Sequence, residues 1–103
     1  MEDIKTITPQ ELEEKIEAGE KLEIVDVRED EEVQHGMIEG AKHIRMGDIP
    51  EKLDHFDKDK EYIFVCRSGN RSNNVCHYMQ DQGYKVRNMV GGMLNWTGEV
   101  IVK

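Results

Sequence analysis

Cys66 has the clearest potential for chemistry, because it lies between an apolar run and a loop rich in glycine and arginine. The preceding residues, 62–65, are aromatic or β-branched and predict a short buried strand. Apolar residues then recur at helical spacing, at Val75, Cys76 and Met79. Backbone N–H groups at the start of a helix have no partners within it and stabilise an anion held in the turn. The spacing therefore predicts a thiolate at Cys66, in a strand-loop-helix turn.

The loop after this cysteine contains residue types that lower the pKa of a thiol. Arg67 and Arg71 supply positive charge, which together with a helix N-terminus can bring a cysteine pKa from about 8.5 to roughly 3.5–7.5. Gly69 lets the backbone turn its amides inward, and Asn70 tolerates unusual backbone angles. We expect Ser72 to be the helix N-cap or a first-turn residue with a structural role. The predicted anion-binding loop consists of Arg67, Ser68, Gly69, Asn70, Arg71 and Ser72.

Strand and helix patterns alternate on both sides of this loop. The capping box of Thr8 and Glu11, with proline at the first helical position, predicts a helix from Pro9 to Ala18 that stops at Gly19. The other expected elements are strands at 22–27, 42–44, 62–65 and 85–89, and helices at 28–34, 47–53, 72–82 and 93–96. This alternation predicts an α/β fold with a mostly parallel sheet of about five strands and helices on both faces.

Composition limits the classes of function. The 103 residues, 37% of them hydrophobic, suffice for a single domain over 1–103 and leave no room for a second catalytic domain. The formal net charge of −8 opposes binding to nucleic acid or anionic membranes. The N-terminal residues lack a signal-peptide pattern and no apolar run reaches membrane-spanning length, so we expect a cytoplasmic location. The cysteines and histidines show no metal-ligand spacing, and we expect no metal and no cofactor.

The loop resembles the active-site loop of rhodaneses, the single-domain sulfurtransferases, with Cys66 at the persulfide-forming position. Three further motifs typical of that family have counterparts here, Asp26-Val27-Arg28, Gly36-Met37-Ile38-Glu39-Gly40-Ala41 and Gly91-Gly92-Met93-Leu94-Asn95-Trp96. The resemblance runs from about Ile4 to Trp96, nearly the whole chain. The chain departs from the usual family residues at three positions outside the loop, Met37, Glu39 and Met93.

The resemblance implies sulfur transfer by double displacement. The Cys66 thiolate would attack the outer sulfur of thiosulfate or another small anionic donor, which leaves a persulfide on Cys66. A thiol, cyanide or a protein acceptor would then take the outer sulfur. Arg67 and Arg71 would orient the donor, and a purely structural contact is the alternative for either one. Arg28 and Arg45 follow neighbouring strands and are expected as pocket neighbours.

Several other residues have simpler structural interpretations. Cys76 shares an apolar helix stripe, so we expect core packing instead of a resolving cysteine. Asp26 with Arg28 resembles the family's structural ion pair. Trp96 is expected to pack on the core, with a lip on the active-site pocket as the alternative. The acidic run at 29–32 is expected to be a solvated helix face.

Two other classes of function are open at this point. A cysteine-dependent phosphatase or arsenate reductase uses a similar loop, typically with five residues between cysteine and arginine. Here four residues separate Cys66 from Arg71, and Val65 stands where such a phosphatase would have histidine. The other alternative is a persulfide carrier or regulatory module that acts with a protein partner, although the complete loop argues against an inert module.

Overall fold

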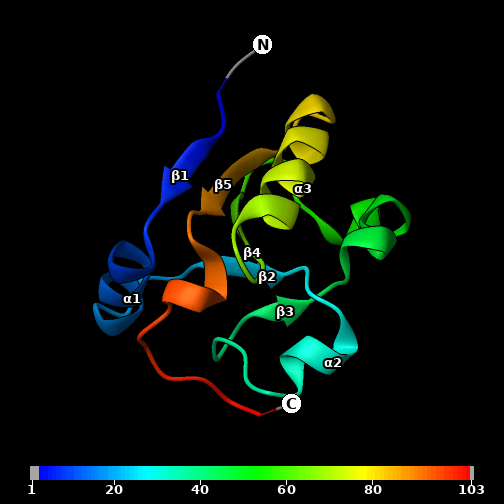
Figure 1. Cartoon of the computed structure of the whole chain (residues 1–103). Helices are drawn as coiled ribbons and strands as arrows, with labels where there is room; N and C mark the ends of the chain where they lie inside the picture. Colours follow the sequence, from blue (N-terminus) through cyan, green and yellow to red (C-terminus); the bar gives the residue numbers. More distant parts are fainter. Residues whose placement is uncertain (1–2, 103) are drawn as a thin grey trace.

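The computed structural model describes residues 3–102 and contains a five-stranded sheet with helices on both faces (Figure 1). The strands follow the order β1-β5-β4-β2-β3 across the sheet. Their bounds are β1 Lys5–Ile7, β2 Glu23–Asp26, β3 Lys42–His43, β4 Glu61–Val65 and β5 Lys85–Met89. Each neighbouring pair in this part of the chain is parallel, so the predicted α/β sheet is confirmed.

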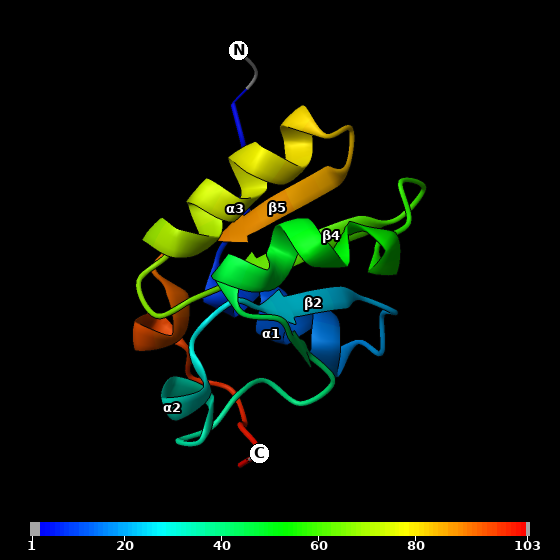
Figure 2. The same cartoon turned by 90° about the vertical axis from the view of Figure 1, so that its right-hand side faces the viewer.

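Helical segments cover the two faces of the sheet, as the sequence predicts. The α-helices are α1 Pro9–Glu17, α2 Asp30–Val33 and α3 Asn70–Asp81, and the 3₁₀ segments are η1 Met46–His55 and η2 Gly92–Asn95. Figure 2 shows α3 in front of the sheet and α1 behind it. In Figure 1, α2 and η2 lie toward the end of the molecule to which the strand arrows point. The carboxyl ends of parallel strands are where such sheets place their ligands.

The central strand β4 is buried on both faces. On one face Phe64 belongs to an apolar cluster that includes Met79 of α3. On the other face Ile63 belongs to a second cluster, which includes Leu12 of α1. Because successive side chains of a strand point to opposite faces, a strand between two helix layers is apolar throughout. The backbone that carries Cys66, directly after β4, is therefore fixed from both sides.

The helix after the loop begins two residues earlier than predicted. Gly69 is its N-cap and takes φ +98°, in the left-handed region, so Gly69 and not Asn70 has the unusual backbone angle. The helix therefore starts at Asn70, and Ser72 is its third residue. The N–H groups of a first turn have no partner inside the helix, so the Ser72 N–H is available to a group in the loop.

The other element boundaries differ from the predictions by small amounts. The capping box is confirmed, since Glu11 N donates to Thr8 Oγ1 at 3.1 Å and Thr8 N to Glu11 Oε1 at 3.0 Å. The segment η1 continues to His55, beyond the predicted range, through a kink at Lys52. The strand Lys5–Ile7 was not predicted, because it has three residues, of which only one is buried.

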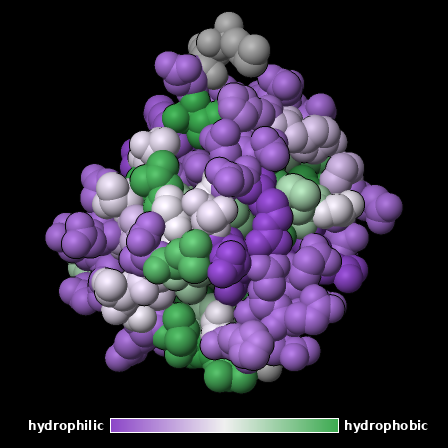
Figure 3. All heavy atoms as spheres, in the orientation of Figure 1, coloured by the Kyte–Doolittle hydropathy of each residue, from purple (hydrophilic) through white to green (hydrophobic). Residues whose placement is uncertain are grey.

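The face drawn in Figure 3 is largely hydrophilic, with apolar side chains in scattered patches. Exposed large apolar side chains among the described residues include Leu94, which is 60% exposed and belongs to η2. Within residues 3–102, no helix combines the length and apolar character needed to cross a membrane.

Candidate active site

The Cys66 sulfur is surrounded by hydrogen-bond donors from the loop and from the first turn of α3. Gly69 N donates to Cys66 Sγ at 3.0 Å, and Ser72 N and Ser72 Oγ each lie 3.3 Å from it. The whole Cys66 residue is 0% exposed. A thiolate accepts hydrogen bonds and has no proton to donate, so this arrangement suits the ionised form of the side chain.

These donors lower the pKa of Cys66 in spite of its burial. Burial is the largest single influence and raises the pKa, because a charge is costly to remove from water. The hydroxyl and N–H of Ser72, and then the N–H groups of Gly69 and Ser68, act in the opposite direction and leave the pKa below its ordinary value. Arginine charge is not among the largest causes, so neutral donors take the role that the sequence assigned to Arg67 and Arg71.

The segment η2 turns the loop carbonyls away from the sulfur. Met93 N donates to Cys66 O at 2.8 Å, and Leu94 N donates to Arg67 O at 3.0 Å. The C=O and N–H of one planar trans peptide point to opposite sides. Holding Arg67 O against η2 therefore directs the Ser68 N–H to the other side, where it is one of the groups that lower the Cys66 pKa.

Glycines allow this close approach between η2 and the loop. A Cβ on Gly92 would lie 2.4 Å from Arg67 O and 2.5 Å from Cys66 O, so no side chain fits there. Gly69 has φ +98°, and a Cβ at that position would lie 3.1 Å from Gly91 N. The Gly-Gly motif near the C-terminus is thus part of the structure that shapes the loop.

Arg71 is paired with a carboxylate from another helix. Its Nη1 and Nη2 donate to Glu32 Oε1 and Oε2, each at 2.7 Å, which joins α3 to α2. The hydrogen bond from Arg71 is the main reason that the pKa of Glu32 falls to about 2. The pKa of Arg71 is raised, first by Glu32 and to a lesser extent by the charge of Cys66. The expectation that the acidic run at 29–32 is merely solvated is therefore wrong for Glu32.

Arg67, in contrast, is exposed at the mouth of the loop. No hydrogen bond or ion pair joins its side chain to another residue in the described part of the chain. Ser68 and Asn70 are exposed beside it, whereas Gly69 is buried. Arg67 is thus the loop cation that is available to an incoming anion.

Arg28 and Arg45, the expected pocket neighbours, have other partners. Arg28 Nη2 donates to Asp26 Oδ2 and to the carbonyl of Gly36, each at 2.8 Å, and the Asp26–Arg28 pair is buried. Arg45 is exposed and pairs with Asp48 at 2.9 Å. Among the described contacts, neither arginine bonds to the Cys66 loop. Arg28 instead joins the end of β2 to the turn at Gly36.

Cys76 lies inside α3 and packs in the apolar cluster with Phe64 and Met79. Burial, with a smaller contribution from the charge of Cys66, raises the pKa of Cys76 to about 12. A thiol with such a pKa stays protonated and unreactive at neutral pH.

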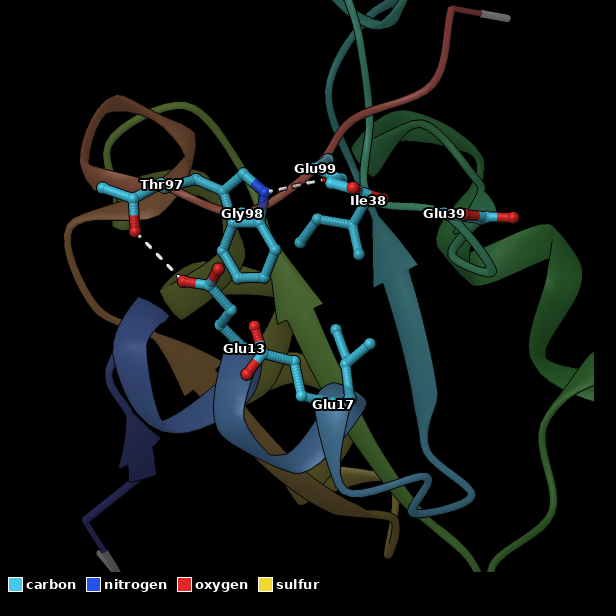
Figure 4. A pocket seen from close by; sticks show the side chains of 9 residues that line it. Glu13, Glu17, Ile38, Glu39, Thr97, Gly98 and Glu99 are labelled. Atoms are coloured by element: carbon cyan, nitrogen blue, oxygen red, sulfur yellow. Dashed lines mark hydrogen bonds between the residues drawn. The ribbon is translucent and has the colours of Figure 1, made fainter.

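Trp96 lines a cavity of about 460 Å³ on the α1 side of the molecule (Figure 4). Its Nε1 donates to Glu99 O at 3.2 Å, and Thr97 Oγ1 donates to Glu13 Oε1 at 3.1 Å. The lining includes the carboxylates of Glu13 and Glu17 but no residue of the Cys66 loop. The alternative in which Trp96 forms a lip on the active-site pocket therefore finds no support.

Two residues that contact the site were not identified from the sequence. Glu32 binds Arg71, and Asn88 of β5 is hydrogen-bonded to both Gly69 and Ser72. Asparagine is depleted in strands, so its presence two residues after the buried Val86, on the same face of β5, was an available signal. The acidic run around Glu32 offered no comparable signal, because charged helix faces are common.

The chain is similar to known proteins over nearly its whole length. The family model described as Rhodanese-like domain matches residues 8–99. The chain is 62% identical over 97 residues to "Putative sulfurtransferase YtwF" of Bacillus subtilis, covering 94% of each. It is 30% identical over 97 residues to "Thiosulfate sulfurtransferase GlpE" of Ectopseudomonas mendocina, covering 93% of this chain and 87% of that protein. A crystal structure of a rhodanese-like domain protein from Staphylococcus aureus matches with a TM-score of 0.92 and 40% identity, covering 97% of this chain and 99% of that one. The chain belongs to the rhodanese-like domain family.

Proposed function

We propose that this protein is a sulfurtransferase that carries sulfane sulfur as a persulfide on Cys66. The thiolate attacks the outer sulfur of thiosulfate or another persulfide donor, so that a new S–S bond forms at Cys66. The S–S bond of the donor breaks, and sulfite or the remainder of the donor leaves with the electron pair. A thiol, cyanide or a protein acceptor then takes the outer sulfur, and the Cys66 thiolate is regenerated.

The convergence of donors on Cys66 Sγ is the observation that carries this proposal. Gly69 N, Ser72 N and Ser72 Oγ lie within 3.3 Å of one sulfur atom. Donors arranged in advance around a developing or transferred negative charge stabilise it without reorganisation. The thiolate and the persulfide are both anionic, so the same loop can serve both states of the site.

Arg67 supports a small anion as the sulfur donor. It is an exposed cation at the mouth of the loop, on a chain whose formal net charge is −8. Local positive charge on an acidic protein concentrates anions at one place. The relative named as a thiosulfate sulfurtransferase favours thiosulfate as that donor. The two free thiols suit a reducing compartment, and we propose the cytoplasm.

The pairing of Arg71 favours sulfur transfer over phosphatase chemistry. In a cysteine-dependent phosphatase the loop arginine must face the tetrahedral oxyanion. Here the two terminal nitrogens of Arg71 bind the two carboxylate oxygens of Glu32, each at 2.7 Å, which directs the end of the side chain to α2. Turnover of an aryl phosphate, without persulfide formation from thiosulfate, would favour a phosphatase over a sulfurtransferase.

A persulfide-carrier role with a protein partner is the second candidate. Leu94 is 60% exposed, and its N–H is bonded to Arg67 O in the loop. An exposed apolar side chain directly beside the site suits contact with a protein. The rates of sulfur uptake from thiosulfate, glutathione persulfide and a persulfidated protein distinguish the two roles, since a carrier should favour the protein donor.

Intact mass spectrometry after incubation with thiosulfate tests the proposal directly. We expect the protein to gain one sulfur atom, which a reducing thiol removes. The Cys76→Ser variant should gain the same atom, and Cys66→Ser should gain none. Failure to load sulfur from any of the three donors, or loading on Cys76, would contradict the proposal.

A further inference from the structure

Asn88 is a buried polar residue that contacts Gly69 and Ser72, two of the residues whose donors face the Cys66 sulfur. It is 4% exposed and lies in β5. Its Nδ2 donates to Gly69 O at 3.1 Å, and its Oδ1 accepts a hydrogen bond from Ser72 Oγ. Gly69 and Ser72 are the same residues that hydrogen-bond to Cys66 Sγ. Asn88 is therefore connected to the Cys66 sulfur through two residues, Gly69 and Ser72.

The partners of Asn88 fix the orientation of its amide. A backbone carbonyl can only accept, so Nδ2 must face Gly69 O and Oδ1 must face Ser72. The Ser72 hydroxyl carries a single proton but faces two acceptors, Asn88 Oδ1 and Cys66 Sγ. It can donate a full hydrogen bond to only one of them at a time.

The charge on Cys66 Sγ decides which acceptor is stronger. In the thiolate, Sγ bears the negative charge, and hydrogen bonds to ionised acceptors are roughly twice as strong as neutral ones. Once Sγ is bonded to a second sulfur, the charge moves to the outer atom and Sγ becomes a weak acceptor. The amide oxygen of Asn88 is then the better partner. Ser72 is fully buried, so its hydroxyl has no access to bulk water as an alternative.

We propose that Asn88 is a positioning residue that shares the Ser72 hydroxyl proton with Cys66. The hydroxyl donates to Sγ while Sγ is a thiolate, and to Asn88 Oδ1 once Sγ carries a second sulfur. The proton stays bonded to Ser72 in both states, and only its direction changes. The persulfide half of this inference rests on the proposed function, whereas the thiolate half rests on the contacts alone.

A double-mutant cycle tests the inference without any sulfur donor. The readout is the rate of iodoacetamide alkylation of Cys66 against pH, measured in a Cys76→Ser background, because its midpoint reports the thiol pKa. Asn88→Asp keeps an oxygen toward Ser72 and makes it a charged, stronger acceptor, whereas Asn88→Ala removes the acceptor. Each substitution is made with Ser72 present and with Ser72→Ala.

The comparison between the two serine backgrounds isolates the hydroxyl. Loss of the Gly69 contact, and the added charge of Asn88→Asp, act in both backgrounds and therefore cancel. The charged side chains at the loop are Arg67, Arg71 and Glu32, the partner of Arg71, and they are the same in every variant.

We expect the two substitutions to couple to Ser72 with opposite signs. Asn88→Asp should raise the midpoint more when Ser72 is present, because the carboxylate draws the proton away from Sγ. Asn88→Ala should have the opposite effect. The change that it causes in the alkylation midpoint should be more negative with Ser72 present than in the Ser72→Ala background, because the hydroxyl can then donate to Sγ alone. Each difference should amount to about threefold in alkylation rate below the midpoint.

Equal midpoint shifts in the two backgrounds would overturn the inference. A purely structural asparagine would lower the thermal midpoint and leave this coupling at zero. If circular dichroism shows that one variant does not fold, the other variant alone gives the sign of the coupling. Coupling without persulfide formation in the mass-spectrometric experiment would contradict the proposed function and leave the thiolate role of Asn88 standing.

Discussion

Cys66 and Cys76 are both free and both 0% exposed, yet their pKa values move in opposite directions. Around Cys76 no group among residues 3–102 offsets the cost of burying a charge, and its pKa rises to about 12. Around Cys66 the donors of Ser72, Gly69 and Ser68 outweigh burial and lower the pKa. The comparison shows that the groups facing the sulfur, and not its accessibility, set the direction in which the pKa of a buried cysteine moves.

The position of each sulfur relative to α3 explains the difference. Cys66 precedes this helix, whose first-turn N–H groups have no internal acceptors and can face an anion. Cys76 lies in the middle of the helix, where the backbone N–H groups are already bonded to carbonyls one turn earlier. The same helix therefore offers free N–H groups to one buried sulfur and none to the other.

The largest expected effect comes from removing the Cys66 sulfur, with removal of the Cys76 sulfur as the comparison. Cys66→Ser should reduce the transfer of sulfur from thiosulfate to cyanide at least roughly a thousandfold, because the nucleophile is lost. Cys76→Ser should retain most of this activity. The measurement is thiocyanate formation, with thermal unfolding as a check on the fold. A folded Cys76→Ser variant as inactive as Cys66→Ser would show that the two sulfurs act together.

Removal of one hydrogen-bond donor should move the pKa of Cys66 toward the high pKa of Cys76. Ser72→Ala deletes the hydroxyl that lies 3.3 Å from Cys66 Sγ and lowers its pKa, so the substitution should raise the thiol pKa. Alkylation below the midpoint should then slow about tenfold. Ser68→Ala is the matched control, since Ser68 is exposed and contributes its backbone N–H, which the substitution keeps. Equal shifts in both variants would mean that the hydroxyl has no particular role.

Arg67, the exposed cation beside Cys66, should favour anionic sulfur donors over neutral ones. Arg67→Ala should raise KM for thiosulfate by about three- to tenfold and change the use of a neutral persulfide donor little. Arg45→Ala makes the same change in net charge at a residue that pairs with Asp48, and should leave both KM values nearly unchanged. Equal losses with anionic and neutral donors would identify Arg67 as a structural residue.

The smallest effect is expected at the ion pair between α2 and α3. Glu32→Gln should lower the free energy of unfolding by about 1 kcal/mol at pH 7, measured by urea denaturation. The pKa of Glu32 is about 2 in the folded protein against an ordinary value of 4.5, so the unfolded chain binds the proton first as pH falls. The contribution is complete above about pH 4.5 and is lost toward pH 2. A stability difference unchanged between pH 7 and pH 2 would contradict this assignment.

The sheet and the position of Cys66 were predictable because they depend on local patterns. Strand and helix periodicity, a capping box and the Gly69 turn are properties of short segments. The partners of the loop were not predictable in this way. Arg71 meets Glu32 across 39 residues, and Asn88 meets Gly69 across 19 residues. Whether the Arg71 side chain is free or paired depends on where α2 packs. The residue spacing within the loop carries no information about that packing.

The surroundings of Ser72 also depend on packing that the sequence does not report. Ser72 was predicted to be the helix N-cap or a first-turn residue, within the anion-binding loop. The helix instead begins at Asn70, with the left-handed Gly69 as its N-cap, so Ser72 turns both its N–H and its hydroxyl toward the sulfur.

The hydrogen bond from Leu94 N to Arg67 O gives one short 3₁₀ turn a role on each of its sides. Its outer side carries the exposed Leu94 side chain, and its inner side orients the peptide whose N–H contributes to the low pKa of Cys66. A displacement of this turn would therefore change the direction of the Ser68 N–H relative to the sulfur.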